Sequence, residues 1–85
     1  MKICVAVFRS RTETYKFIEY MQSFNVPCVA ISTPKEARVG CGISAKFPYS
    51  KLDFVNKIIG NGGFNAFKGI FIIQKQGGRS STVKI

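Results

Sequence analysis

The sequence predicts an α+β fold whose elements follow one another in the order βαββαβ. Apolar runs rich in β-branched residues alternate along the chain with segments whose apolar residues recur at helical spacing. Each helical segment begins with residues typical of helix starts and ends at asparagine or glycine. No linker, low-complexity tract or internal repeat interrupts the 85 residues, so we expect one domain.

The first strand and the first helix carry the clearest signals. Lys2 to Phe8 is continuously apolar after the lysine, which indicates a central strand buried on both faces. Ser10 to Glu13 matches the capping box S-x-x-E, which satisfies free backbone amides at a helix start. Apolar residues then recur at helical spacing, at Phe17, Ile18, Met21 and Phe24. We therefore expect a helix over residues 11–24 that stops at Asn25.

Two further strands are expected between the helices. Residues 26–32 form the second strand, and Pro27, which lacks an amide donor, places that strand at a sheet edge or marks its start. Residues 42–47 form the third strand, which Pro48 ends. Its side chains alternate, with Ile43, Ala45 and Phe47 on one face and Ser44 and Lys46 on the other.

A second helix and a fourth strand complete the expected fold. Ser50 is expected to cap the helix, whose buried stripe is Leu52, Val55, Ile58 and Ile59. The glycine turn, residues 60–63, ends the helix, and it could also cradle a phosphate as a small anion nest. Residues 64–74 form the fourth strand. The expected domain therefore spans residues 1–74, and residues 75–85 are expected to be a flexible basic tail.

The order βαββαβ is that of the ferredoxin-like, split βαβ arrangement. Its sheet has four antiparallel strands in the spatial order 4-1-3-2, with both helices on one face. The directions of these strands bring three junctions to one edge of the sheet, namely residues 8–12, 33–41 and 60–63.

Charge and rare residue types limit the classes of function. Thirteen Lys and Arg against four Asp and Glu give a net charge of +9, which suits an anionic partner or simple solubility. Histidine is absent and the three cysteines form no C-x-x-C pair, so we expect neither a metal site nor a Cys–His catalytic pair. No cofactor is implied, and the few carboxylates favour a carrier or accessory protein over a free-standing enzyme. The first apolar run is too short for a signal peptide or a membrane span, so we expect a cytoplasmic protein with no membrane partner.

Cys41 is the candidate chemical centre of the expected edge. The topology places it near the N-terminus of the first helix, where free amides carry roughly +0.5 of a charge. Four basic residues are expected nearby: Arg9, Arg11, Lys35 and Arg38. Such surroundings lower the pKa of a thiol, and the flanking glycines Gly40 and Gly42 would leave the sulfur open to attack.

The alternative for Cys41 is a small buried hydrophobe, which is the role of many cysteines. Cys4 and Cys28 fit that alternative better, because both lie inside apolar segments. Their strands are separated by one strand in the expected sheet. The two backbones are then on the order of 9–10 Å apart, too far for a disulfide.

The loop motifs resemble the selenium/sulfur carrier-like domain family, a group of small bacterial domains. The resemblance is carried by Thr33-Pro34-Lys35-Glu36, then Cys41-Gly42-Ile43, then Lys46-Phe47, and it covers roughly residues 2–73. It implies that Cys41 carries sulfur or selenium as a persulfide or selenopersulfide. The implied supporting residues are Thr33, Pro34, Lys35, Arg38, Gly40, Gly42, Arg9, Ser10 and Arg11. The implied partner is a sulfur donor or acceptor such as a cysteine desulfurase.

Two other functions stay open at this point. A basic ferredoxin-like sheet could bind nucleic acid, and the segment from Lys68 to Ile73 faintly matches an RNA-recognition pattern. That segment falls on the fourth strand and offers one aromatic, so this function is the weaker candidate. A regulatory or oligomerising module is the third candidate, because the sheet face without helices would expose apolar residues and could form a homodimer.

Overall fold

The computed structural model describes residues 2–37 and 42–85. The elements are β1 (Lys2–Phe8), α1 (Arg11–Ser23), β2 (Val29–Ser32), η1 (Lys35–Ala37), β3 (Ile43–Pro48), η2 (Tyr49–Lys51), α2 (Leu52–Gly60), β4 (Phe67–Gln76) and β5 (Arg79–Lys84). The short η elements are 3₁₀ turns. The predicted α+β class is confirmed.

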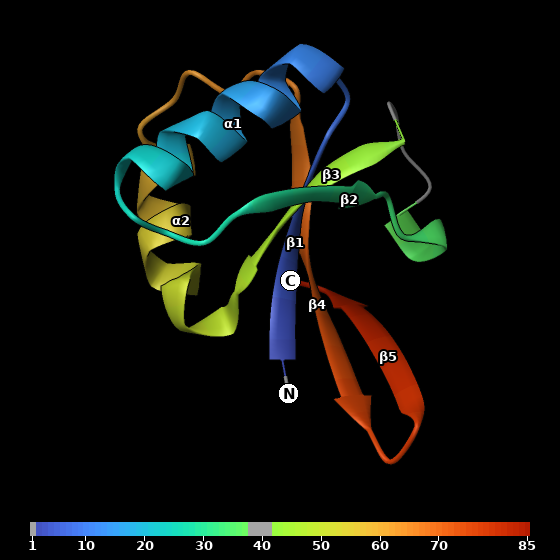
Figure 1. The fold of residues 1–85 in the computed structure, drawn as a ribbon. Helices are drawn as coiled ribbons and strands as arrows, with labels where there is room; N and C mark the ends of the chain where they lie inside the picture. The colour runs from blue at the N-terminus through green and yellow to red at the C-terminus, as the bar shows by residue number, and fades with distance from the viewer. Residues whose placement is uncertain (1, 38–41) are drawn as a thin grey trace.

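The sheet has five strands in the order β2-β3-β1-β4-β5, and all its pairings are antiparallel (Figure 1). The predicted sheet of four strands in the order 4-1-3-2 is therefore wrong in strand number and in one edge. Within the larger sheet, β1 still lies between β3 and β4, and β2 pairs with β3. The additional strand, β5, pairs with β4 from Phe71↔Lys84 to Gln76↔Arg79.

The segment expected to be a flexible tail is thus the end of β4 and the whole of β5. Gly77 and Gly78 join these strands with φ values of 58° and 82°. Positive φ at both central residues is what a tight two-residue hairpin turn requires, and glycine adopts it without strain. The sequence of β5 is polar and therefore carries no apolar pattern that would predict a strand. An edge strand can form without such a pattern, because ladder hydrogen bonds stabilise it as well as buried side chains.

One face of the sheet packs against both helices and forms the main core. Alternate residues of β1 point into it, namely Cys4, Ala6 and Phe8, each 0% exposed. The Phe8 ring lies 5.3 Å from Phe17 and 5.8 Å from Phe64, centroid to centroid. These tilted ring contacts fix α1 and the segment before β4 against the centre of the sheet.

The other face has a smaller core closed by η1. Val5 and Val7 point to this side and are 0% exposed, packed with Phe71 and with Ala37 of η1. In Figure 1, η1 lies on the side of the sheet away from α1 and α2. The expectation that this face is an exposed apolar surface is therefore wrong for its central residues, because the chain covers them itself. A homodimer through this face stays a prediction, with less apolar area to support it.

The predicted capping residues are correct for α1 and wrong for α2. Ser10 caps α1 as predicted, with its Oγ accepting a hydrogen bond from the Glu13 amide at 3.2 Å. Asn25 takes the left-handed conformation, with φ 62°, just after the helix ends. The predicted cap at Ser50 is wrong, since Ser50 lies inside η2 and α2 begins after Lys51 with no side-chain cap.

Candidate functional site

Four strand ends meet at one edge of the sheet, which we call the upper edge. The pairing register sets the end of β1 opposite the start of β4, through Phe8↔Phe67. It also sets the end of β2 opposite the start of β3, through Ser32↔Ile43. Since β1 pairs with β3 through Val7↔Ser44, all four ends belong to the same edge. The ends of β1 and β2, from which two of the three predicted junctions start, therefore lie along it.

Hydrogen bonds fasten the start of α1 to this edge. The Arg9 amide donates to the Ala66 carbonyl at 2.8 Å, and the Ala66 amide donates to Glu13 Oε1 at 3.0 Å. The capping-box pattern predicts the Ser10 amide as the partner of the Glu13 carboxylate. The carboxylate instead holds the chain just before β4, so Glu13 links the start of α1 to the segment before β4.

Thr14 links the same helix start to β3. Its Oγ1 donates within the helix to the Ser10 carbonyl at 3.0 Å and lies 3.4 Å from the Ile43 carbonyl. Thr14 is 0% exposed. Sequence patterns gave no reason to select it, because a threonine inside a helix is ordinary and its partner on β3 is 29 residues away.

The loop between β2 and β3 begins and ends at the upper edge. The Thr33 amide donates to the Gly42 carbonyl at 3.0 Å, which continues the ladder by one step beyond Ser32 and Ile43. The Thr33 and Ser44 hydroxyls lie 2.7 Å apart, and Ser44 is 0% exposed. Gly42 is exposed with φ 77°, a conformation that favours glycine. Predicted site residues Thr33 and Gly42 are thus held at the base of the loop.

Beyond Thr33 the loop turns onto the face without helices. The Ala37 amide donates to the Pro34 carbonyl at 3.0 Å and closes the turn of η1. Ala37 then packs on the smaller core, and Lys35 is exposed. The predicted neighbours Arg38, Gly40 and Cys41 lie outside the described residues.

The upper edge has a positive character. Arg9 and Arg11 are exposed beside the first turn of α1, where backbone amides contribute further positive potential. Glu13 is the acidic residue of that turn, and its carboxylate is engaged by the Ala66 amide. Within residues 2–37 and 42–85, no group of Cys, Asp or Glu side chains is placed to hold a metal ion.

The two cysteines that the structure describes are buried and free. Cys4 is 0% exposed and Cys28 is 2% exposed, and both belong to the main core. Burial raises the pKa of Cys4 to about 11 and the pKa of Cys28 to about 12, because the charged thiolate is poorly solvated there. Neither thiol is therefore suited to nucleophilic chemistry at neutral pH.

Comparison with known proteins gives one match. The model of the family described as "Putative Se/S carrier protein-like" matches residues 3–70. The chain belongs to this family. No curated protein and no solved structure matches the chain.

The family match covers the parts that build the upper edge. It runs from β1 into β4 and includes both helices and the loop after β2, which confirms the family predicted from the Thr33–Glu36 and Cys41–Ile43 motifs. Strand β5 lies beyond the matched residues. Neither described helix has the length and apolar character that a membrane crossing requires.

Proposed function

We propose that this Se/S carrier-like protein holds one sulfur or selenium atom on Cys41, as a persulfide or selenopersulfide. The observation that carries the proposal is the burial of Cys4 and Cys28 in the main core, with the pKa of each thiol raised far above neutral pH. Thiolate chemistry in this chain therefore falls to Cys41, which precedes Gly42 at the exposed base of the loop.

The proposed loading step is a sulfur exchange between two cysteines. The Cys41 thiolate attacks the terminal sulfur of a cysteine persulfide on the donor protein. A new S–S bond forms at Cys41 while the S–S bond of the donor breaks, and the donor cysteine leaves as a thiolate. The step needs no external oxidant, because the sulfur passes on at the same oxidation level. A selenium donor would follow the same scheme.

The charge of the upper edge supports both the thiolate and its partners. Arg9, Arg11 and the amides at the start of α1 favour a nearby anion, and a thiolate or a persulfide anion is one. A net charge of +9 also favours an acidic donor or acceptor, through faster encounter. We expect the donor to be a cysteine desulfurase in the cytoplasm, where free thiols stay reduced.

Mass spectrometry after loading tests the proposal. Incubation with a cysteine desulfurase and cysteine should add the mass of one sulfur atom to the intact protein, and a reducing thiol should remove it. Cys41→Ser should gain nothing, whereas the matched control Cys28→Ala should load as the wild type does. Loading that persists in Cys41→Ser, or no loading of the wild type, would contradict the proposal.

The structure gives nucleic-acid binding less support. Recognition of single strands on a sheet uses exposed rings on which bases stack. On the face without helices, the aromatic of β4 is Phe71, and it is only 8% exposed against Val5, Val7 and Ala37. Sequence-independent attraction to phosphates through the net charge would remain, and it would be lost at moderate salt.

A further inference from the structure

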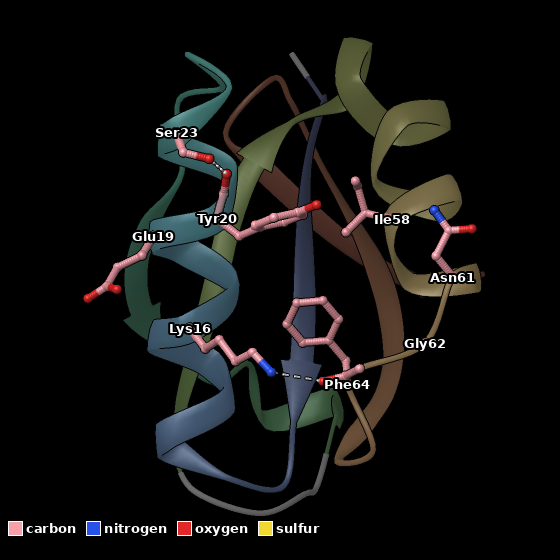
Figure 2. Close-up of a pocket in the computed structure, with 9 residues that line it drawn as sticks. Lys16, Glu19, Tyr20, Ser23, Ile58, Asn61, Gly62 and Phe64 are labelled. Carbon is pink, nitrogen blue, oxygen red and sulfur yellow. Dashed lines mark hydrogen bonds between the residues drawn. The ribbon is translucent and has the colours of Figure 1, made fainter.

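A groove between α1 and α2 has no part in the proposed sulfur chemistry. Its volume is about 480 Å³, within the range of sites that take small organic molecules. It opens on the helical side of the sheet, and the glycine turn after α2 forms one end (Figure 2). Its walls come from α1, from α2 and from the segment before β4.

Two aromatic rings and an isoleucine make the apolar part of the groove. Figure 2 shows the Tyr20 ring reaching from α1 toward Ile58 of α2, with the Phe64 ring below them. Phe64 is fixed from behind, since its ring lies 5.6 Å from that of Phe17 in an edge-to-face contact. Tyr20 is 43% exposed and is braced by Phe24, with ring centroids 5.1 Å apart. The rings are therefore held in place while their groove-facing surfaces remain accessible.

A cation lies at the glycine end of the same groove. Lys16 Nζ donates to the Gly63 carbonyl at 3.2 Å and lies 5.3 Å from the centroid of the Phe64 ring. In the described part of the chain Lys16 forms no ion pair, and Figure 2 shows the Glu19 carboxylate pointing away from the groove. Its partners are thus a neutral carbonyl and a ring, which leaves its charge uncompensated.

The glycine turn leaves this end open. Gly62 and Gly63 have φ values of 87° and 93°, and a Cβ built on either would meet no atom within 4 Å. A ligand can therefore approach the backbone closely beside the Lys16 ammonium. This end of the groove thus combines a positive charge with an open backbone, and both suit an anionic group.

We propose that the groove binds a small planar organic anion, with its ring between Tyr20 and Phe64 and its anionic group at Lys16 and the glycine turn. This site is distinct from the upper-edge loop, and it does not rest on the proposed function. Ring-to-ring contact and the ammonium each contribute modestly, so neither a ring alone nor an anion alone should bind as well as a molecule that has both.

NMR titration of the full chain labelled with ¹⁵N tests the site, with 1-naphthyl phosphate as the probe. Amide shifts should saturate and concentrate at residues 16–20 and 61–64. Two further titrations separate the contribution of the ring from that of the anionic group. One uses 1-naphthol, which has the ring alone, and the other uses inorganic phosphate, which has the anion alone. Both should bind at least about threefold more weakly than 1-naphthyl phosphate.

Charge-matched variants make the test specific. Lys16→Met should weaken 1-naphthyl phosphate by up to about fivefold, the upper end for an exposed ion pair, and leave 1-naphthol unchanged. The control Lys57→Met removes an exposed lysine of α2 that does not line the groove, and should change neither. Tyr20→Ala should weaken both aromatic probes about fivefold.

Three results would overturn the proposal. Equal effects of Lys16→Met and Lys57→Met would mean that the probe responds only to net charge. A loss of 1-naphthol binding in Lys16→Met would mean that Lys16 merely shapes the turn. Shifts that fail to saturate, or that lie mainly outside the groove, would mean that the groove serves another occupant, such as an apolar side chain of a partner protein.

Discussion

Replacing Cys41 by serine should remove nearly all rapid alkylation from the folded protein. Burial raises the pKa of Cys4 to about 11 and that of Cys28 to about 12, from an ordinary value of 9.0. Below these values the thiolate fraction falls about tenfold for each unit of pKa. At neutral pH, Cys4 therefore presents about 100-fold and Cys28 about 1000-fold less thiolate than an ordinary thiol. Exposed fractions of 0% and 2% restrict the reagent further.

Alkylation with iodoacetamide, quenched at intervals and mapped by peptide mass spectrometry, measures this difference. The wild type should react at a single cysteine, Cys41→Ser at none over the same period, and the control Cys28→Ala like the wild type. A series over pH should give a midpoint for Cys41 below about 8.5. Modification of Cys4 or Cys28 as fast as Cys41 would refute the reasoning from burial. A midpoint at or above about 8.5 would refute a lowered pKa at Cys41.

Three further predictions concern the stability of the fold. The folded-state pKa values of Cys4 and Cys28 lie above the unfolded value, so their contribution is complete below about pH 9 and is lost as the pH rises toward 11 and 12. Near pH 10 the burial of each thiol should lower the free energy of unfolding by about 1 kcal/mol, and urea unfolding should show a smaller alkaline loss in Cys28→Ala than in the wild type; equal losses would contradict this. Gly42→Ala should cost about 1 kcal/mol in the same assay because of its positive φ, whereas the control Gly60→Ala, at the end of α2, should not destabilise. Gly77→Val should strain the hairpin turn and release β5, so amide exchange should lose protection in the β4–β5 ladder and keep it between β1 and β4; unchanged protection of β5 would show that the turn is not what holds it.

The predictable part of the fold came from signals that are local to each element. The apolar run from Lys2 to Phe8 and the helical spacing after Ser10 gave β1 and α1 nearly to the residue, because burial and capping there agree. Strand β5 has no apolar run, and its pairing depends on the Gly77-Gly78 turn as much as on its own side chains. The start of α2 likewise depends on how the chain leaves β3 through Pro48 and η2, which the serine at position 50 does not determine.

The candidate site also has a part that the sequence predicts and a part that it does not. Strand direction alone predicts that residues 8–12, 33–41 and 60–63 approach one edge. The strand registers bring the ends of β1 and β2 and the starts of β3 and β4 to one edge, and they do not include residues 60–63. The path of the loop between its two ends was not predictable, because Ala37 turns it onto the face without helices through tertiary packing. Thr14 and the partner of the Glu13 carboxylate were missed for a related reason, since these contacts reach to β3 and to the segment before β4.

A loaded carrier should keep its sulfur while folded and lose it on unfolding. In the folded chain Cys4 and Cys28 lie in the main core, so neither thiol is accessible to a persulfide at the surface. Denaturant exposes both thiols and returns each pKa toward its ordinary value. An exposed thiolate can then attack the inner sulfur of the Cys41 persulfide, which forms a disulfide and releases the outer sulfur as hydrogen sulfide. Dilution of the loaded protein into guanidinium, at low concentration and without added thiol, should therefore release sulfide, and the doubly substituted Cys4→Ala, Cys28→Ala protein should release none. Sulfide release at the same rate from the folded wild type would show that a core thiol reaches the persulfide, and that burial does not protect the cargo.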